Sequence, residues 1–120
     1  MRAIAVAAVL IAAGIGPAAA QSGAWLTDAR SACAVWDPQP VPDTTIAWTG
    51  GCTDGKASGD GMLTTFRAGR VVERDAGEFV DGKQTGRGVR EYVNGRYVGT
   101  FKDGLFDGQG VYVSPTKGLL

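Results

Sequence analysis

The sequence predicts an all-β fold, an open antiparallel meander of β-hairpins with a short helix or strap as a cap at its N-terminal end. Two observations support this prediction. A pattern of glycines and aromatic residues recurs three times, over residues 48–61, 77–88 and 97–110. Each copy centres on an Asp-Gly pair, which is a frequent tight turn of β-hairpins. The chain is therefore expected to be a small repeat array and not a fold built around one catalytic cleft.

Each repeat unit has the features of a hairpin. The run from Arg96 to Lys102 alternates its side chains and leads into an Asp-Gly pair, and a second run beginning Gly-x-Gly follows. Asn94-Gly95 predicts a further turn of type I′ between hairpins, because both residues tolerate positive φ. The expected turn residues within the repeats are Asp54, Gly55, Asp81, Gly82, Asp103 and Gly104.

The glycines inside the predicted strands need a physical reason, because glycine there costs backbone entropy and offers no side chain for packing. Tyr97 and Phe101 share a face of their strand, and the next strand places Gly108 and Gly110 on a comparable face. An aromatic ring can cover the glycine of an adjacent strand. We therefore expect one face packed with rings over glycines and an opposite face half exposed to water.

Residues 1–20 have the features of a secretory signal peptide. Arg2 is followed by an apolar run to Ile15 and then by three alanines ending at Ala20, the arrangement that precedes a cleavage site. Cleavage near Ala20-Gln21 would give an exported protein, periplasmic or secreted. An uncleaved membrane anchor is the alternative, but the apolar run is shorter than the roughly 20 residues that a spanning helix needs.

Residues 21–47 carry no repeat and are expected to form the N-terminal cap. A helix could begin at Thr27-Asp28, but Pro38, Pro40 and Pro42 would stop it. The prediction is a short helix or turn followed by an extended strap.

The two cysteines, Cys33 and Cys52, are expected to form a disulfide, since an even number in a small exported domain favours pairing. A metal site is the alternative, but two thiols without histidine make a poor set of ligands. Cys52 takes the place of an aromatic residue on the packed face of the first repeat. A bridge to Cys33 would therefore tie the strap across the open end of the array.

The composition argues against an enzyme. The chain has no histidine, which excludes Ser-His and Cys-His nucleophile pairs as well as His-bound metals. Aspartates near the turns could form an acid–base pair or hold calcium, but an aspartate before glycine is what a turn requires. Without Arg2 the chain has 11 basic and 12 acidic residues. We expect no cofactor, no metal and no nucleic acid as partner.

The units resemble MORN repeats (membrane occupation and recognition nexus), whose pattern is Tyr-x-Gly-x-Phe-x-Asp-Gly-x-x-x-Gly-x-Gly. Residues 97–110 match it throughout, whereas Asp75 replaces the tyrosine of the second unit, and Trp48 and Cys52 replace the tyrosine and phenylalanine of the first. The leader from Cys33 to Cys52 is similar to that of exported bacterial members. The resemblance implies repeats at residues 48–69, 75–95 and 97–113, with a C-terminal tail at 114–120.

The resemblance and the extended surface of a repeat sheet imply a non-enzymatic protein-interaction or scaffold module of the bacterial cell envelope. Binding to membrane lipid or envelope glycan is the alternative. The expected partner is another envelope protein or a second copy of the chain, and a membrane surface has weaker support. Phe106, which lies in a turn, is expected to be the most exposed aromatic residue. The expected binding surface comprises Tyr92, Tyr97, Phe101, Phe106, Tyr112, Arg87, Arg96 and Lys102.

Overall fold

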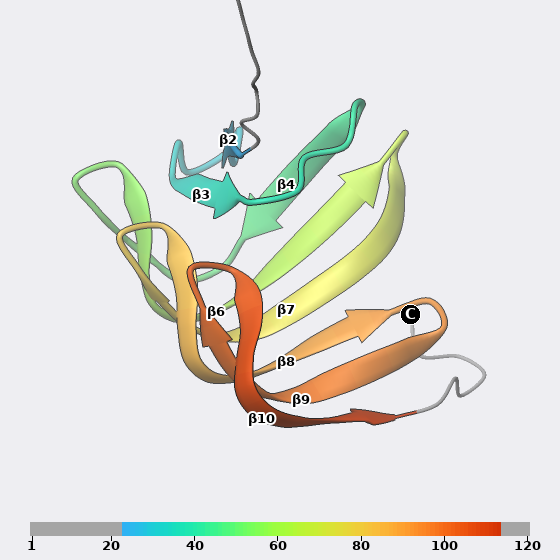
Figure 1. Cartoon of the computed structure of the whole chain (residues 1–120). Helices are drawn as coiled ribbons and strands as arrows, with labels where there is room; N and C mark the ends of the chain where they lie inside the picture. The colour runs from blue at the N-terminus through green and yellow to red at the C-terminus, as the bar shows by residue number, and fades with distance from the viewer. Residues whose placement is uncertain (1–22, 114–120) are drawn as a thin grey trace, which may run out of the picture.

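A computed structural model describes residues 23–113, which form nine strands and no helix (Figure 1). The expected signal peptide (1–20) and tail (114–120) lie outside the described residues. Five consecutive strands pair in an antiparallel meander, so the predicted all-β, open antiparallel fold is confirmed. These strands are β6 (Lys56–Arg67), β7 (Arg70–Val80), β8 (Lys83–Tyr92), β9 (Gly95–Lys102) and β10 (Leu105–Val113).

Two short strands cover the first edge of the meander. On the side of β6 away from β7, β4 (Thr44–Trp48) pairs with residues 63–67 and β5 (Gly51–Thr53) pairs with residues 56–58. At the opposite edge, β10 pairs with β9 alone. Among the described strands, the sheet therefore has a covered edge at β6 and an open one at β10.

The Asp-Gly pairs form the tips of the three hairpins. Asp54, Asp81 and Asp103 have φ values of 52°, 51° and 51°, and the glycines that follow have φ values of 78°, 78° and 86°. Two successive positive φ values are the geometry of a type I′ turn, which glycine accepts without steric cost.

The turn expected at Asn94-Gly95 is wrong by one residue. Gly95 pairs with Tyr92, so the turn consists of Val93 and Asn94 and Gly95 already belongs to β9. Gly95 has a φ of 149°, and the Tyr112 ring lies against it where a Cβ would stand. The glycine here serves contact between strands and not the turn itself.

Strands β8 and β10 shift register at their Gly-x-Gly pairs, whereas the shift in β6 lies at Thr65 and Phe66. The register between β7 and β8 shifts after Gly77, and that between β9 and β10 shifts between Asp107 and Gly110. Such bulges add a residue to one strand and increase its bend and twist. The sheet is consequently a curved trough, with the Asp-Gly tips raised along one side (Figure 1).

The helix expected near the N-terminus is wrong. Residues 24–37 form a β-hairpin of β2 (Ala24–Thr27) and β3 (Ala34–Asp37). The Asp28 carboxylate accepts hydrogen bonds from the Arg30 amide at 3.3 Å and from Ser31 Oγ at 2.8 Å. These bonds hold a turn, because a short polar side chain that binds the nearby backbone competes with helix formation.

Strand β3 runs across the hairpin tips. The amide of Ala34 donates to the Gly55 carbonyl at 2.8 Å, and the amide of Trp36 donates to the Gly82 carbonyl at 2.8 Å. Two residues further on, the Pro38 ring lies against Gly104. The strap therefore crosses all three tips. At the first edge of the array it pairs with β6 only at Ala34 and Lys56, and β4 and β5 cover the rest of that edge.

The main core lies between this N-terminal arm (residues 23–43) and the first two repeats. Cys33 and Cys52 form a disulfide with their Cα atoms 5.8 Å apart. Cys33 is buried but Cys52 is exposed, so the expected place of Cys52 on the packed face is not observed. The buried apolar cluster consists of Cys33, Val35, Ile46, Trp48, Ala57, Leu63 and Phe79.

Candidate functional site

Two of the predicted contact residues are packing residues. Tyr97 and Phe101 are buried on the concave face of the sheet. Their ring centroids lie 5.4 Å apart, and the Phe106 ring stacks on Tyr97 at a centroid distance of 3.8 Å. The Tyr97 ring also covers Gly110, as the pattern of rings and glycines predicts. These rings hold the third repeat together.

The other aromatic residues are more accessible. Phe106 is 44% exposed, but Tyr112 is 54% exposed, so the expectation that Phe106 is the most exposed aromatic residue is wrong. Tyr112 lies on β10, and none of the other described strands pairs with the far side of β10. Tyr92 is half-buried and lines a cavity on the concave face.

The predicted basic residues lie on the convex face. Arg87, Arg96 and Lys102 are exposed there, and Arg96 lies 3.6 Å from the Glu91 carboxylate. Arg90, three residues after Arg87, belongs to the concave face, where its side chain is 14% exposed. The basic residues of β8 thus do not form one patch.

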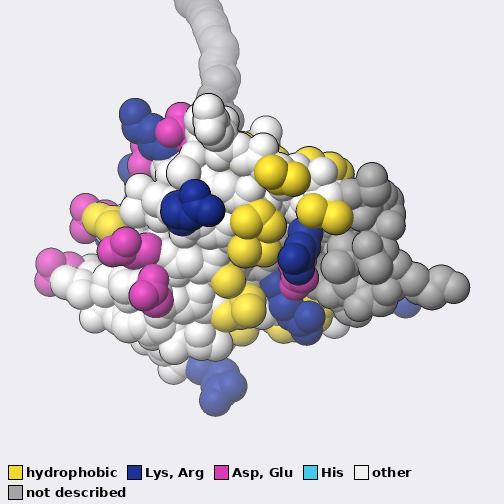
Figure 2. Space-filling model, turned by 90° about the horizontal axis from the view of Figure 1, so that it is seen from below, with side chains coloured by type: hydrophobic (Ala, Val, Ile, Leu, Met, Phe, Trp, Pro, Cys, Tyr) yellow, Lys and Arg dark blue, Asp and Glu magenta, His cyan; other side chains and the backbone are white. Residues whose placement is uncertain are grey.

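An apolar stripe crosses the convex face. Its members are register neighbours on successive strands, and Val111 at its end is 63% exposed. Figure 2 shows hydrophobic side chains in a band across this face, with Lys and Arg side chains beside it. We call it the convex stripe; it consists of Met62, Ala76, Val89, Val98 and Val111.

The stripe continues into the open edge. Strand β10 is exposed over its whole length. The large apolar side chains exposed on it are Leu105, Phe106, Val111, Tyr112 and Val113. An edge strand has unpaired backbone groups and can receive a strand of another chain.

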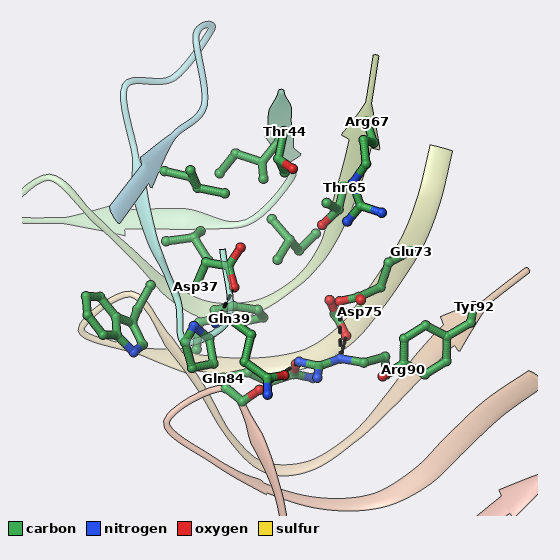
Figure 3. Close-up of a pocket in the computed structure, with 18 residues that line it drawn as sticks. Asp37, Gln39, Thr44, Thr65, Arg67, Glu73, Asp75, Gln84, Arg90 and Tyr92 are labelled. Atoms are coloured by element: carbon green, nitrogen blue, oxygen red, sulfur yellow. Dashed lines mark hydrogen bonds and ion pairs between the residues drawn. The ribbon is translucent and has the colours of Figure 1, made fainter. Parts of the chain in front are cut away.

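A cavity of about 180 Å³ lies between the N-terminal arm and the concave face. Its apolar lining includes Leu26, Ile46 and Leu63. Its polar lining includes Glu73, Asp75 and Arg90, which converge at one end of the cavity (Figure 3). The remaining polar residues around the cavity are Asp37, Gln39, Thr44, Thr65, Arg67, Gln84 and Tyr92.

The two acids share one cation at the floor of this cavity. Arg90 Nε lies 3.2 Å from Glu73 Oε2 and contacts Asp75 Oδ1 at shorter range. Arg90 Nη2 also donates to the Gly104 carbonyl at 2.9 Å and to Gln84 Oε1 at 3.5 Å. Asp75 is 1% exposed and Gln84 is 2% exposed. The second repeat therefore contains a buried polar network where its neighbours contain rings.

Burial decides the protonation of this network. Burial, a hydrogen bond with Asp75 and repulsion by its charge raise the pKa of Glu73 to about 8, against the opposing charges of Arg90 and Arg67. Burial alone would lower the pKa of Arg90, but the charges of Asp75 and Glu73 outweigh it, and the pKa is raised. Glu73 is thus largely neutral at pH 7 while Arg90 is charged.

Sequence reasoning missed this cluster, although a signal was present. Arg90 corresponds in the repeat to Leu63 and Tyr112, and Asp75 corresponds to Trp48 and Tyr97. Polar residues at two packing positions of the same unit indicate that they compensate one another. The repeat pattern identified Asp75 as a departure from the repeat, but it did not identify Arg90 as its partner.

Within residues 23–113, no group of three His, Cys, Asp or Glu side chains is placed to hold a metal ion. The same residues contain no helix that is long and apolar enough to cross a membrane.

These features define an array of β-hairpin repeats that lie side by side in one sheet. Two adjoining stretches, residues 76–95 and 97–118, match the family model of the MORN repeat. Over 44 residues the chain is 48% identical to Alsin of Rattus norvegicus, a match that covers 36% of this chain and 3% of Alsin. No solved structure matches. Residues 76–118 are thus similar to MORN repeats, and MORN repeats are in general modules that interact with proteins or membranes.

Proposed function

We propose that the chain is a non-enzymatic protein-interaction module of the bacterial cell envelope, and that β10 is its contact strand. The observation that carries the proposal is the open edge: within residues 23–113, β10 pairs on one side only and is exposed throughout. An apolar edge strand of this length would aggregate if it had no partner, because soluble proteins shorten, charge or cover such edges. The occupant is a strand of another envelope protein that extends the sheet.

The location in the envelope rests on sequence and chemistry. The signal-peptide features of residues 1–20 predict export. The disulfide between Cys33 and Cys52 fits an oxidising compartment.

The experiment is crosslinking of the exported protein in cells, followed by mass spectrometry of the crosslinked peptides. We expect crosslinks from β10 to a second protein, and we expect Val111→Lys to abolish them, because a charge on an edge strand opposes pairing. Val80→Lys is the matched control, since Val80 is 48% exposed on β7, away from the open edge. Equal crosslinking in both variants, or crosslinks only between two copies of this chain, would contradict an envelope partner on β10.

Membrane binding is a second candidate, favoured by the convex stripe with Arg87, Arg96 and Lys102 exposed on the same face. Anionic lipid attracts such a combination of apolar and basic side chains. Flotation with vesicles of anionic phospholipid at low salt tests it. Recovery of the protein with the vesicles, reduced in Val98→Glu, supports membrane binding; protein that stays at the bottom of the gradient removes it.

A further inference from the structure

The cavity under the N-terminal arm exists because the second repeat lacks the leading aromatic ring of the other two repeats. In the third repeat Tyr97 and Phe106 stack at 3.8 Å and fill the corresponding space. In the first repeat the Trp48 ring packs 4.6 Å from that of Phe79. In the second repeat the equivalents of Tyr97 and Phe106 are Asp75 and Gln84, which are smaller and polar. A volume of about 180 Å³ remains open beside them.

The Asp75 carboxylate at the floor of this cavity has unused capacity to accept hydrogen bonds. An ionised carboxylate can accept about four. Arg90 Nε binds Oδ1, whereas Oδ2 is buried and has no protein partner. The neutral Glu73 carboxyl is hydrogen-bonded to Asp75 and supplies at most one hydrogen to this carboxylate. A further donor, from a ligand, is needed to use the remaining lone pairs of the buried Asp75 carboxylate.

The other groups around the cavity suit a neutral ligand with hydroxyl groups. Two carboxylates, Asp37 and Asp75, are balanced by the guanidinium groups of Arg67 and Arg90, while the raised pKa of Glu73 keeps its carboxyl neutral near pH 7. A charged ligand would disturb that balance. Thr65 and Gln39 can each donate as well as accept, which matches a hydroxyl group.

The apolar lining completes the description of a small-molecule site. Leu26 and Ile46 line the same cavity as the polar cluster, and so does Leu63, the register partner of Asp75 on β6. Binding sites for small molecules combine an apolar lining with a few convergent polar groups. The volume corresponds to about six molecules of liquid water, so the ligand is small.

We infer that the cavity between the N-terminal arm and the concave face binds a small neutral polyol or a monosaccharide, with a hydroxyl group donating to Asp75 Oδ2 and another bound by Thr65. This site is separate from β10 and does not depend on the proposed function.

Saturation-transfer NMR on the exported, disulfide-bonded protein tests the inference, with glycerol, D-glucose and N-acetylglucosamine as neutral probes and putrescine and acetate as charged ones. We expect transfer to at least one neutral probe and none to the charged ones. Titration should show that Thr65→Val weakens binding roughly fivefold, the value of one hydrogen bond. Asp75→Asn should weaken binding at least tenfold, because the loss involves a charged acceptor.

Thr64→Val is the matched control, because Thr64 precedes Thr65 on β6 and faces the other side of the sheet. It should leave the affinity unchanged. Thermal melting of each variant shows whether the fold is kept, and Thr65→Val decides the matter if Asp75→Asn does not fold. Absence of transfer to every neutral probe, binding of a charged probe instead, or equal weakening by Thr64→Val and Thr65→Val would each overturn the inference. Glycerol and the sugars, compared with one another, distinguish a polyol from a saccharide.

Discussion

At the scale of single residues, Arg90 joins the second repeat to the third. Its guanidinium lies 5.0 Å from the centroid of the Phe101 ring and 5.3 Å from that of Phe106, and it donates to the Gly104 carbonyl. A guanidinium over aromatic faces is favourable, but the burial of its charge is costly without Asp75. Asp75 and Arg90 therefore replace the apolar contact of the other repeats with an ion pair. Loss of either residue should destabilise the protein, because the other charge would remain buried without its partner.

Replacement of one member or of both tests this exchange. Asp75→Tyr restores the repeat residue but leaves Arg90 buried with Glu73 as its remaining acid, and we expect a loss of about 3 kcal/mol in the free energy of unfolding. The double variant Asp75→Tyr with Arg90→Leu copies the neighbouring repeats, and its stability should lie within about 1 kcal/mol of the parent or exceed it. Urea unfolding measures both values. A double variant that is no more stable than Asp75→Tyr alone would show that the second replacement does not compensate the first.

Glu73 predicts a specific pH dependence of stability. Its pKa is about 8 in the folded protein against an ordinary value of 4.5, so the folded state retains a proton that the unfolded state releases. The stability from this group is complete below pH 4.5 and is lost as the pH rises to 8.

Glu73→Gln keeps a neutral hydrogen-bonding group and should remove that loss. We expect the free energy of unfolding of Glu73→Gln, relative to that of the parent, to rise between pH 5 and pH 8 by up to about 1.4 kcal/mol per pH unit. Above pH 8 the difference should level off, and the melting temperature should follow the same trend. Melting curves across this range provide the measurement. Glu78→Gln, exposed on the same strand, should show no such trend. A constant difference between Glu73→Gln and the parent would refute the assignment.

At the scale of strands, the packing of aromatic rings over glycines explains why the first and third repeats have the same arrangement of ring and Gly-x-Gly pair. Trp48 covers Gly61 and Tyr97 covers Gly110, so a leading ring of one strand lies over the second glycine of the Gly-x-Gly pair on the neighbouring chain segment. The ring supplies the burial that the glycine lacks, and the glycine supplies room for the ring. The bend at Gly-x-Gly then follows from the bulge beside it.

Gly110→Ala tests this complementarity at one contact. A Cβ on Gly110 would overlap the Tyr97 ring, while the backbone φ of Gly110 lies outside the left-handed region. We expect a loss of about 1–3 kcal/mol on urea unfolding, as for other cases of overpacking. Val111→Ala on the same strand removes an exposed methyl pair and should change stability by about 0.5 kcal/mol or less. If Gly110→Ala is as mild as Val111→Ala, the ring does not depend on the glycine.

An element could be predicted from the sequence where its conformation depends on neighbouring residues, and could not where it depends on contacts with distant ones. The Asp-Gly tips were predictable because type I′ turns demand positive φ at both positions. The helix expected after Trp25 was wrong, because β2 and β3 are held by pairing with each other and with the distant tips at Gly55 and Gly82. The Asp75 and Arg90 pair lies 15 residues apart in sequence, and its closeness depends on strand register, which the repeat pattern alone did not indicate.

At the scale of the whole molecule, the N-terminal arm holds the hairpin tips in line. Every second residue of β3 and its extension meets the next tip, from Ala34 at Gly55 to Pro38 at Gly104. Side chains of a strand alternate in direction, so the residues between, such as Val35, point into the core. The arm therefore serves as a cross-strap and also as the roof of the cavity. Its attachment at one end is the disulfide between Cys33 and Cys52.

Loss of that disulfide should loosen the strap before it unfolds the sheet. The bridge spans 19 residues in sequence, and a closed loop of that length is worth about 3 kcal/mol through its effect on the unfolded chain. We expect the variant with Cys33→Ser and Cys52→Ser to lose about this much in urea unfolding. Hydrogen exchange should rise most at the amides of Ala34 and Trp36, which bind the tips, and least in β8 and β9, which pair on both sides. Reduction of the native protein should reproduce the result, whereas uniform exchange throughout the sheet would show that arm and array unfold as one unit.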